Sequence, residues 1–424
     1  MLAAMADFPL EVQLALAAGA ASLLGFWIVR GMVTPKLPLL VTDVHKCHDL
    51  LSSTTLAKRA PLNQRLVVAF GIENGFTTTE EEIHHRFRKE VKTSLERMHN
   101  KFARKDLINL ISSSSLSFLR DCRDKRQPIL LVNVVRIAVF RTVLAIFFSD
   151  VPRISDEDVI FITSKMNSLW YNSKSPRKLF LAQYFGRHSS IIQDRNILHQ
   201  KLKTVFPSIT ESEAIPPSEN PLNVLLPAFI GLFGVVLRCI LEVRFRSCEA
   251  DRGEYKNLFH TFLQDPDGRW YEEANGLSVQ QIIAETLRLN PPTRRIYTQR
   301  GSEVVGVDIE QLHRKGEVWG EKPLEWQPKR WAREGLDVVR TVEYIPFGGK
   351  VGRPAEISMC PSRIRGGPKL IALIVGALLG LLGEGWELVE SRDGRDDVSG
   401  NKPLRKGMDA YETLSLCHNS VGRY

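Results

Sequence analysis

Cys360 has the most distinctive chemical setting in this chain. It lies between a Phe347-Gly-Gly turn and an unbroken apolar stretch over residues 370–379. A thiolate in such a place can ligate haem iron, where it pushes electron density onto the metal and favours O–O bond cleavage. The alternative is an ordinary buried thiol, because free cysteine is among the most buried residue types.

Glu285 and Arg288 form a second candidate pair, three positions apart in a predicted helix. Ser278 and Gln281 fit a capping box at its start, and Asn290 with the double proline after it ends the helix. Residues three apart lie on one side of a helix. On an exposed helix such a pair contributes almost nothing to stability, so its meaning depends on the sequence that follows.

Downstream motifs supply that context in a fixed order. They read Asp308-Ile-Glu-Gln-Leu-His313-Arg314, then Glu317-Val-Trp-Gly320, then Trp326-Gln-Pro328-Lys-Arg330-Trp331, and finally the Phe347 turn and Cys360. With Glu285 and Arg288 ahead of them, these motifs resemble the ExxR helix, the HRDPxxWG-like run, the PxRW turn and the cysteine loop of cytochromes P450. Weaker similarity extends over most of the chain to the fungal secondary-metabolism tailoring type.

The resemblance implies a mainly α fold with a small β lobe and haem b as the cofactor. Cys360 would be the axial ligand of the haem iron and the catalytic centre. Phe347 would pack near the sulfur, and Arg353 would contact a haem propionate. Glu285, Arg288 and Arg330 would form a structural triad that holds the cysteine loop.

Two features depart from the family pattern. Cys360 follows Phe347 by 13 positions, where the family has seven, so six additional residues fall within 351–358. The expected oxygen-activating helix carries Ala228-Phe-Ile-Gly-Leu232, with no acid, amide or threonine. Proton delivery would then depend on water or on a substrate group.

The amino terminus predicts a membrane anchor and linker over residues 1–36, followed by one catalytic domain over 37–424. Residues 12–29 are apolar and uncharged, long enough to span a bilayer. Arg30 and Lys36 follow this run, which places the domain on the cytoplasmic side, in the endoplasmic reticulum membrane. A cleaved signal peptide and a buried or interfacial helix are the alternatives.

Residues 222–245 form a second long apolar segment, either another membrane span or the central helix of a large helical protein. Pro227 and the charged residues Arg238, Glu242 and Arg244 favour the central helix. The net charge of +9 is modest, and no nucleic-acid-binding motif is present. We therefore expect no nucleic-acid partner.

These observations predict a haem-thiolate monooxygenase that oxidises a small hydrophobic secondary metabolite or its precursor. It would use O₂ and electrons from an NADPH-dependent P450 reductase. Arg363, Arg365 and Lys369 would either receive an acidic reductase or form an ordinary solvated loop. The alternatives are a non-redox haem-thiolate isomerase or dehydratase, and a degenerate, membrane-tethered P450-like protein without catalysis.

Overall fold

A computed structural model describes residues 37–97, 100–124, 128–207, 209, 215–332, 336–338, 341–349, 360, 366–383, 385–389, 398–407 and 409–418. The predicted anchor and linker, Arg353, Arg363 and Arg365 lie outside the described residues. The catalytic domain predicted over 37–424 is therefore described in part.

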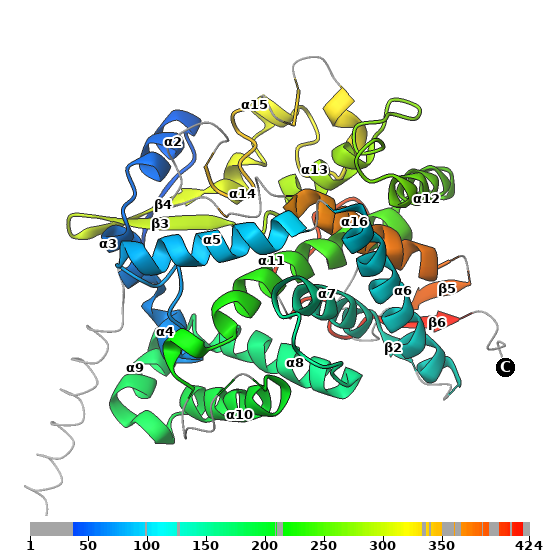
Figure 1. Cartoon of the computed structure of the whole chain (residues 1–424). Helices are drawn as coiled ribbons and strands as arrows, with labels where there is room; N and C mark the ends of the chain where they lie inside the picture. Colours follow the sequence, from blue (N-terminus) through cyan, green and yellow to red (C-terminus); the bar gives the residue numbers. More distant parts are fainter. Residues whose placement is uncertain are drawn as a thin grey trace, which may run out of the picture.

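Helices make up most of the described chain, and α11 runs through the middle of the molecule (Figure 1). The helices are α2 (Val44–Ser52), α3 (Leu56–Arg59), η2 (Ala60–Asn63), α4 (Gln64–Phe70), α5 (Glu81–Arg97), α6 (Lys101–Asp124), α7 (Leu131–Phe147), α8 (Asp156–Asn172), α9 (Pro176–Phe185), η3 (Gly186–His188), α10 (Ser190–Val205), η4 (Pro217–Glu219), α11 (Leu222–Ile240), η5 (Leu241–Arg246), α12 (Glu249–Gln264), α13 (Val279–Leu289), α14 (Ile309–Leu312), α15 (Gly316–Trp319), η6 (Pro328–Ala332) and α16 (Gly367–Leu381).

Two small sheets accompany the helices. The first has the order β1-β4-β3, with β1 (Leu39–Val41) parallel to β4 (Glu303–Asp308) and β3 (Arg295–Arg300) antiparallel to it. The second has the order β2-β6-β5, from β2 (Ile129–Leu130), β6 (Ser415–His418) and β5 (Trp386–Val389), all antiparallel. The predicted mainly α fold with a small β part is confirmed.

The apolar segment at 222–246 is central to the core. Among the described residues, Leu222–Arg246 is the one helix long and apolar enough to cross a membrane, and 67% of its apolar window is buried inside the molecule. Its last turn is a π-helix, η5. The preferred interpretation as a central helix therefore holds.

Three arginines of the helix Leu222–Arg246 form hydrogen bonds with the carboxyl-terminal part of the chain. Arg238 donates to the carbonyls of Arg405 and Gly407, and Arg244 donates to those of Leu382, Gly383 and Trp386. Arg246 reaches the carbonyls of Gly400 and Lys402. Buried carbonyls need such donors, so the three side chains fix where the chain returns beside α11.

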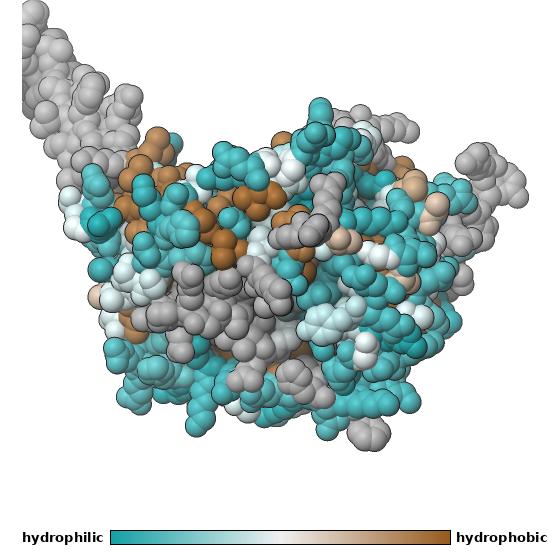
Figure 2. Space-filling view, turned by 90° about the horizontal axis from the view of Figure 1, so that it is seen from above, coloured by the Kyte–Doolittle hydropathy of each residue, from teal (hydrophilic) through white to brown (hydrophobic). Residues whose placement is uncertain are grey.

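The surface is largely hydrophilic in the view of Figure 2, with hydrophobic residues gathered in groups, one of them on the side of α2 and the first sheet. Leu37, Leu39 and Leu40, at the start of the described chain, are exposed by 94%, 62% and 40%. Such exposure is unusual for leucine and marks a surface that another apolar phase could cover.

Candidate active site

Glu285, Arg288 and Arg330 meet in the core below α13. Arg288 approaches both carboxylate oxygens of Glu285 at 2.8 Å, and Arg330 Nε approaches Glu285 Oε1 at 2.8 Å. The side chains of Glu285 and Arg288 are 0% exposed, and that of Arg330 is 1% exposed. The capping box at Ser278 and Gln281 is formed and sets the start of the helix that carries the pair. The structure thus brings the three predicted residues together.

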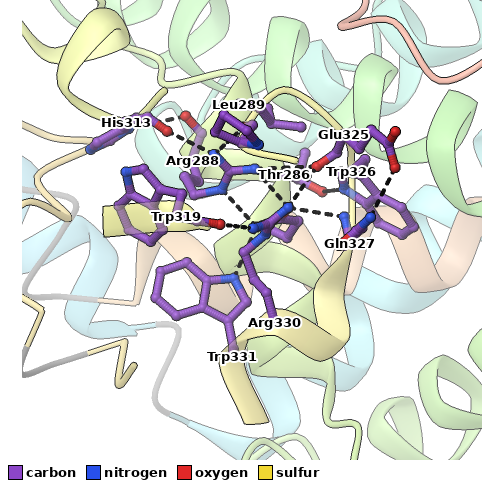
Figure 3. A network of polar contacts seen from close by, with 12 residues as sticks. Thr286, Arg288, Leu289, His313, Trp319, Glu325, Trp326, Gln327, Arg330 and Trp331 are labelled. Carbon is purple, nitrogen blue, oxygen red and sulfur yellow. Dashed lines mark hydrogen bonds and ion pairs between the residues drawn. The ribbon is translucent and has the colours of Figure 1, made fainter. Parts of the chain in front are cut away.

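Neighbouring groups complete this network, which Figure 3 shows from close by. Trp331 Nε1 and the Gln327 amide donate to Glu285 at 3.2 and 2.9 Å. The guanidinium groups donate to backbone carbonyls, those of His313, Pro323 and Glu325 for Arg288 and those of Trp319, Lys322 and Glu325 for Arg330. Buried charges are tolerated where pairing and hydrogen bonds replace water, so this cluster is held in one geometry.

His313 connects the network to the segment that leads to the cysteine. Its Nδ1 lies 3.0 Å from the Arg288 carbonyl, and its Nε2 accepts a 3.0 Å hydrogen bond from the Ile345 amide. These partners assign the neutral tautomer with the proton on Nδ1. The ring stacks on Tyr344 with a centroid separation of 5.7 Å. Through these contacts His313 connects the buried charge network to residues 344–347 and restrains their position.

Cys360 lies at the far end of this chain of contacts. Its amide donates to the Phe347 carbonyl at 3.0 Å, so Cys360 lies directly beside the turn that precedes it. Phe347 is 6% exposed, and Cys360 is half-buried against the main apolar core. The six additional residues of the segment before Cys360 lie outside the described residues.

The middle of α11 is less covered than its two ends. Ala228, Gly231 and Leu232 are half-buried, whereas Leu225 before them and Val236 after them are fully buried. A Cβ added at Gly231 would lie 4.0 Å from Pro292, in the segment between α13 and β3. This apolar strip carries no hydroxyl or carboxylate, as the sequence predicted.

A cationic cluster gathers around the Gly75 carbonyl. His84 Nδ1 lies 3.0 Å from that oxygen, and Arg59 donates to it as well. Burial lowers the pKa of His84, and the positive charges of Arg59 and Arg88 lower it further. Burial and Arg88 lower the pKa of Arg59 to about 10. The charges of Arg59 and Arg88 create a positive potential that would favour an anionic group, whereas the lowered pKa of His84 favours its neutral form.

The sequence analysis did not identify this cluster. Arg86, two residues beyond His84, is exposed and lines a cleft of ≈ 170 Å³ with Glu73 and Glu90. The signal that was available is the spacing of His84 and Arg88, four apart and on one side of α5. Arg59 comes from α3 and could not be found by spacing.

The donor set fits a haem in its chemistry. Cys360 offers a thiol, the α11 strip offers an apolar wall, and Arg59 and Arg88 offer positive charges for carboxylates. Among the described residues, no cluster of three or more His, Cys, Asp or Glu side chains could hold a bare metal ion. The residues are thus better suited to a macrocycle with one thiolate ligand than to a metal centre built from side chains.

Comparisons with known proteins agree with this arrangement. A variant of cytochrome P450SP alpha has a similar solved structure, with a TM-score of 0.52, 14% identity, and coverage of 89% of this chain and 90% of that one. A bifunctional cytochrome P450/NADPH–P450 reductase of Bacillus cereus is 29% identical over 160 residues, which cover 34% of this chain and 14% of that protein. No protein-family profile matches the chain. The fold is that of cytochromes P450; the fungal tailoring type stays a prediction.

Proposed function

We propose that this chain is a haem-thiolate monooxygenase that oxidises a small hydrophobic molecule, a secondary metabolite or its precursor. The observation that carries the proposal is the continuous hydrogen-bonded path from Glu285 through Arg288, His313 and Ile345 to the turn that holds Cys360. The P450 fold and the partial similarity to a P450–reductase fusion support it.

A haem b bound through Cys360 would supply oxygen activation, which a thiolate ligand favours. Phe347 is buried, and its carbonyl accepts from the Cys360 amide; its ring would limit water near the ligand and so tune it. Arg59 and Arg88 would neutralise the cofactor carboxylates. The apolar strip of α11 would exclude water from the substrate but could not relay a proton through a side chain of its own.

Electrons would come from an NADPH-dependent reductase, in keeping with the fusion partner of the similar bacterial protein. Of the basic residues considered for docking, Lys369 is engaged, at 2.9 Å from Asp267, which Arg104 also contacts at 2.7 Å. These two cations hold the pKa of Asp267 well below its usual range. Lys369 would therefore have to leave Asp267 before it could pair with an acidic group of a reductase.

The amino-terminal apolar segment would anchor the domain to the endoplasmic reticulum membrane on its cytoplasmic side. The exposed leucines at 37, 39 and 40 directly follow the anchor and would lie at the membrane surface.

A second function is favoured by one observation, the absence of a proton-relaying side chain in residues 228–232 of α11. A haem-thiolate isomerase or dehydratase does not need this relay. It would turn over its substrate without O₂ or reductase, whereas the monooxygenase requires both.

The test begins with the purified full chain, reduced and treated with carbon monoxide. We expect a Soret band at the position typical of thiolate ligation, and Cys360→Ala should abolish it. Cys239→Ala is the matched control, because Cys239 is a fully buried thiol on α11 and its loss should leave the band unchanged. A chain without haem, or a band that survives in Cys360→Ala, would contradict the proposal.

A further inference from the structure

Pro227 interrupts the backbone hydrogen bonds of α11 near its start. Proline has no backbone N–H, so the carbonyl four residues before it, that of Asn223, receives no hydrogen bond from that position of the helix. A carbonyl inside the molecule needs a donor. The structure supplies one from a distant segment, because Nδ2 of Asn74 donates to the Asn223 carbonyl at 2.9 Å. The proline therefore leaves a place on α11 to which that segment is bound.

Residues 73–77 form the turn that binds there, and a second hydrogen bond holds them to α11. The Glu73 amide donates to Oδ1 of Asn223 at 2.8 Å, so one residue of α11 accepts from two consecutive residues of the turn. Asn74 also organises the turn itself, because its Oδ1 accepts from the Phe76 amide at 2.9 Å. Asn74 is 3% exposed, so these hydrogen bonds are shielded from water.

The same turn carries the carbonyl at the centre of the cationic cluster. The Gly75 carbonyl accepts from Arg59 and lies 3.0 Å from Nδ1 of His84. Gly75 also packs so closely on α5 that an added Cβ would lie 2.5 Å from the Phe87 ring. The turn is thus fixed to α5 by close packing and to α11 by hydrogen bonds, and Arg59 is bound to the turn.

Arg59 is the positive charge whose position depends on this turn. Its guanidinium lies 5.5 Å from the centre of the Phe76 ring, and the residue is buried. A guanidinium has five N–H donors in one fixed plane, so the bond to the Gly75 carbonyl sets the direction of the others. A turn that moved away from α11 would displace these donors with it.

We propose that Asn74 is a positioning residue for the carboxylates of the cofactor. It occupies the carbonyl that Pro227 leaves open on α11 and so holds the turn, and the turn holds Arg59 where its charge meets a carboxylate. Asn74 acts through Arg59 and not by a contact of its own. This inference rests on the proposed function, since it adds a residue to the set that holds the haem.

Reconstitution of the full chain with haem and with haem dimethyl ester tests the proposal, because the ester lacks the free carboxylates. We expect the wild-type chain to bind haem about tenfold more tightly than the ester, since charge-assisted hydrogen bonds to a carboxylate are strong. Asn74→Ala should remove most of this preference. It should weaken haem binding several-fold and keep the affinity for the ester within about twofold, as measured by absorbance titration.

A second substitution separates loss of stability from loss of position. Asn74→Ala removes the donor of the Asn223 carbonyl, and Pro227→Ala returns a helical N–H that takes its place. The double variant should regain stability toward urea and still lack the preference for haem over the ester. A double variant that regained both would overturn the proposal, because Asn74 would then only stabilise the fold.

Asn220→Ala is the matched control. Asn220 is also buried, and its Nδ2 donates to the carbonyls of Phe70 and Gly71 at 3.0 Å, beside the turn but outside it. Its loss should lower stability without changing the ratio of the two affinities. Equal losses of the preference in Asn220→Ala and Asn74→Ala would overturn the proposal.

Hydrogen exchange at the Glu73 amide gives a measurement that needs no cofactor. Its acceptor, the Asn223 side chain, is unchanged in Asn74→Ala, so faster exchange means that the turn has moved from α11. Unchanged exchange would overturn the proposal. A wild-type chain that takes up neither haem nor the ester contradicts the proposed function and this inference with it. A chain that binds both with equal affinity overturns this inference alone.

Discussion

Two arginine-rich clusters in this protein differ in how completely their charges are paired. In the first, both oxygens of Glu285 are bound by guanidinium groups of Arg288 and Arg330, and the remaining donors reach backbone carbonyls. In the second, Arg65 and Lys174 lie beside the Trp170 ring, the charge of Arg294 acts on Lys174, and none of the three has an ion-pair partner among the described residues. The first is fully buried, and the second is half-buried or exposed.

The difference separates charges that stabilise a fold from charges that are available to a ligand. A buried charge left unpaired costs several kcal/mol, so the Glu285 network must be complete for the core to exist. Cations that remain in contact with water can stay unpaired at small cost and retain their electrostatic attraction for an anion. We therefore expect the two clusters to respond to substitution with opposite signs.

Glu285→Gln should have the largest effect on stability. It leaves two buried guanidinium groups without their carboxylate, and removal of one member of a buried pair costs about 3–5 kcal/mol. The measurement is the free energy of unfolding from urea titration. The control is Glu303→Gln, because Glu303 is the exposed first residue of β4. This change should alter the free energy of unfolding by less than about 0.5 kcal/mol.

Equal effects of Glu285→Gln and Glu303→Gln would show that the buried network does not stabilise the fold. A double variant with Arg288→Met should recover part of the loss, because it also removes a guanidinium that the first change leaves uncompensated.

Glu242 is an intermediate case, a buried carboxyl group with one arginine partner, Arg246. Burial raises its pKa from 4.5 to about 7, although Arg246 acts in the opposite direction. Between these values the folded chain binds the proton more tightly than the unfolded chain. The free energy of unfolding should therefore fall as the pH rises from about 4.5 to 7, by at most about 1.4 kcal/mol per pH unit.

Unfolding at pH 5, 6 and 7 measures this slope. Glu242→Gln cannot titrate and should lose this contribution, whereas Glu303→Gln should keep the wild-type slope. Parallel profiles for wild type and Glu242→Gln would contradict the prediction and place the carboxyl group in better contact with a cation than Arg246 alone provides.

Arg294→Gln should have the smallest effect and the opposite sign to Glu285→Gln. It removes a like charge from the cationic cluster, so the free energy of unfolding should stay within about 0.5 kcal/mol of wild type or rise slightly. Added salt should reduce even this difference, because it screens the repulsion. If Arg294→Gln lowered the free energy of unfolding by more than about 2 kcal/mol, Arg294 would stabilise the fold. The proposed difference between the two clusters would then be wrong.

Motifs with a local spacing were predictable from the sequence. Glu285 and Arg288 lie on one helix, and the capping box defined where that helix begins. The order of the motifs then led to Arg330 and Cys360. His84 and Arg88 are also four apart on one helix, but this spacing is common on any helix and does not by itself indicate a site.

Contacts between distant segments were not predictable in this way. Arg59 and His84 meet at the Gly75 carbonyl from different helices, and Arg65, Lys174 and Arg294 come from α4, the end of α8 and the segment before β3. No periodicity links such positions, since their proximity depends on how the helices pack.

The sequence by itself determined the candidate ligand Cys360, the ion pair of α13 and the absence of a proton-relaying side chain in the middle of α11. These depend on residue identity and on spacing within one element. Only the tertiary structure decided that the Cys360 amide meets the Phe347 carbonyl, that His313 joins the charge network to this turn, and how the described charges are paired. Pairing and burial are properties of the packed chain, because a charge finds its partner and loses its water only when distant segments come together.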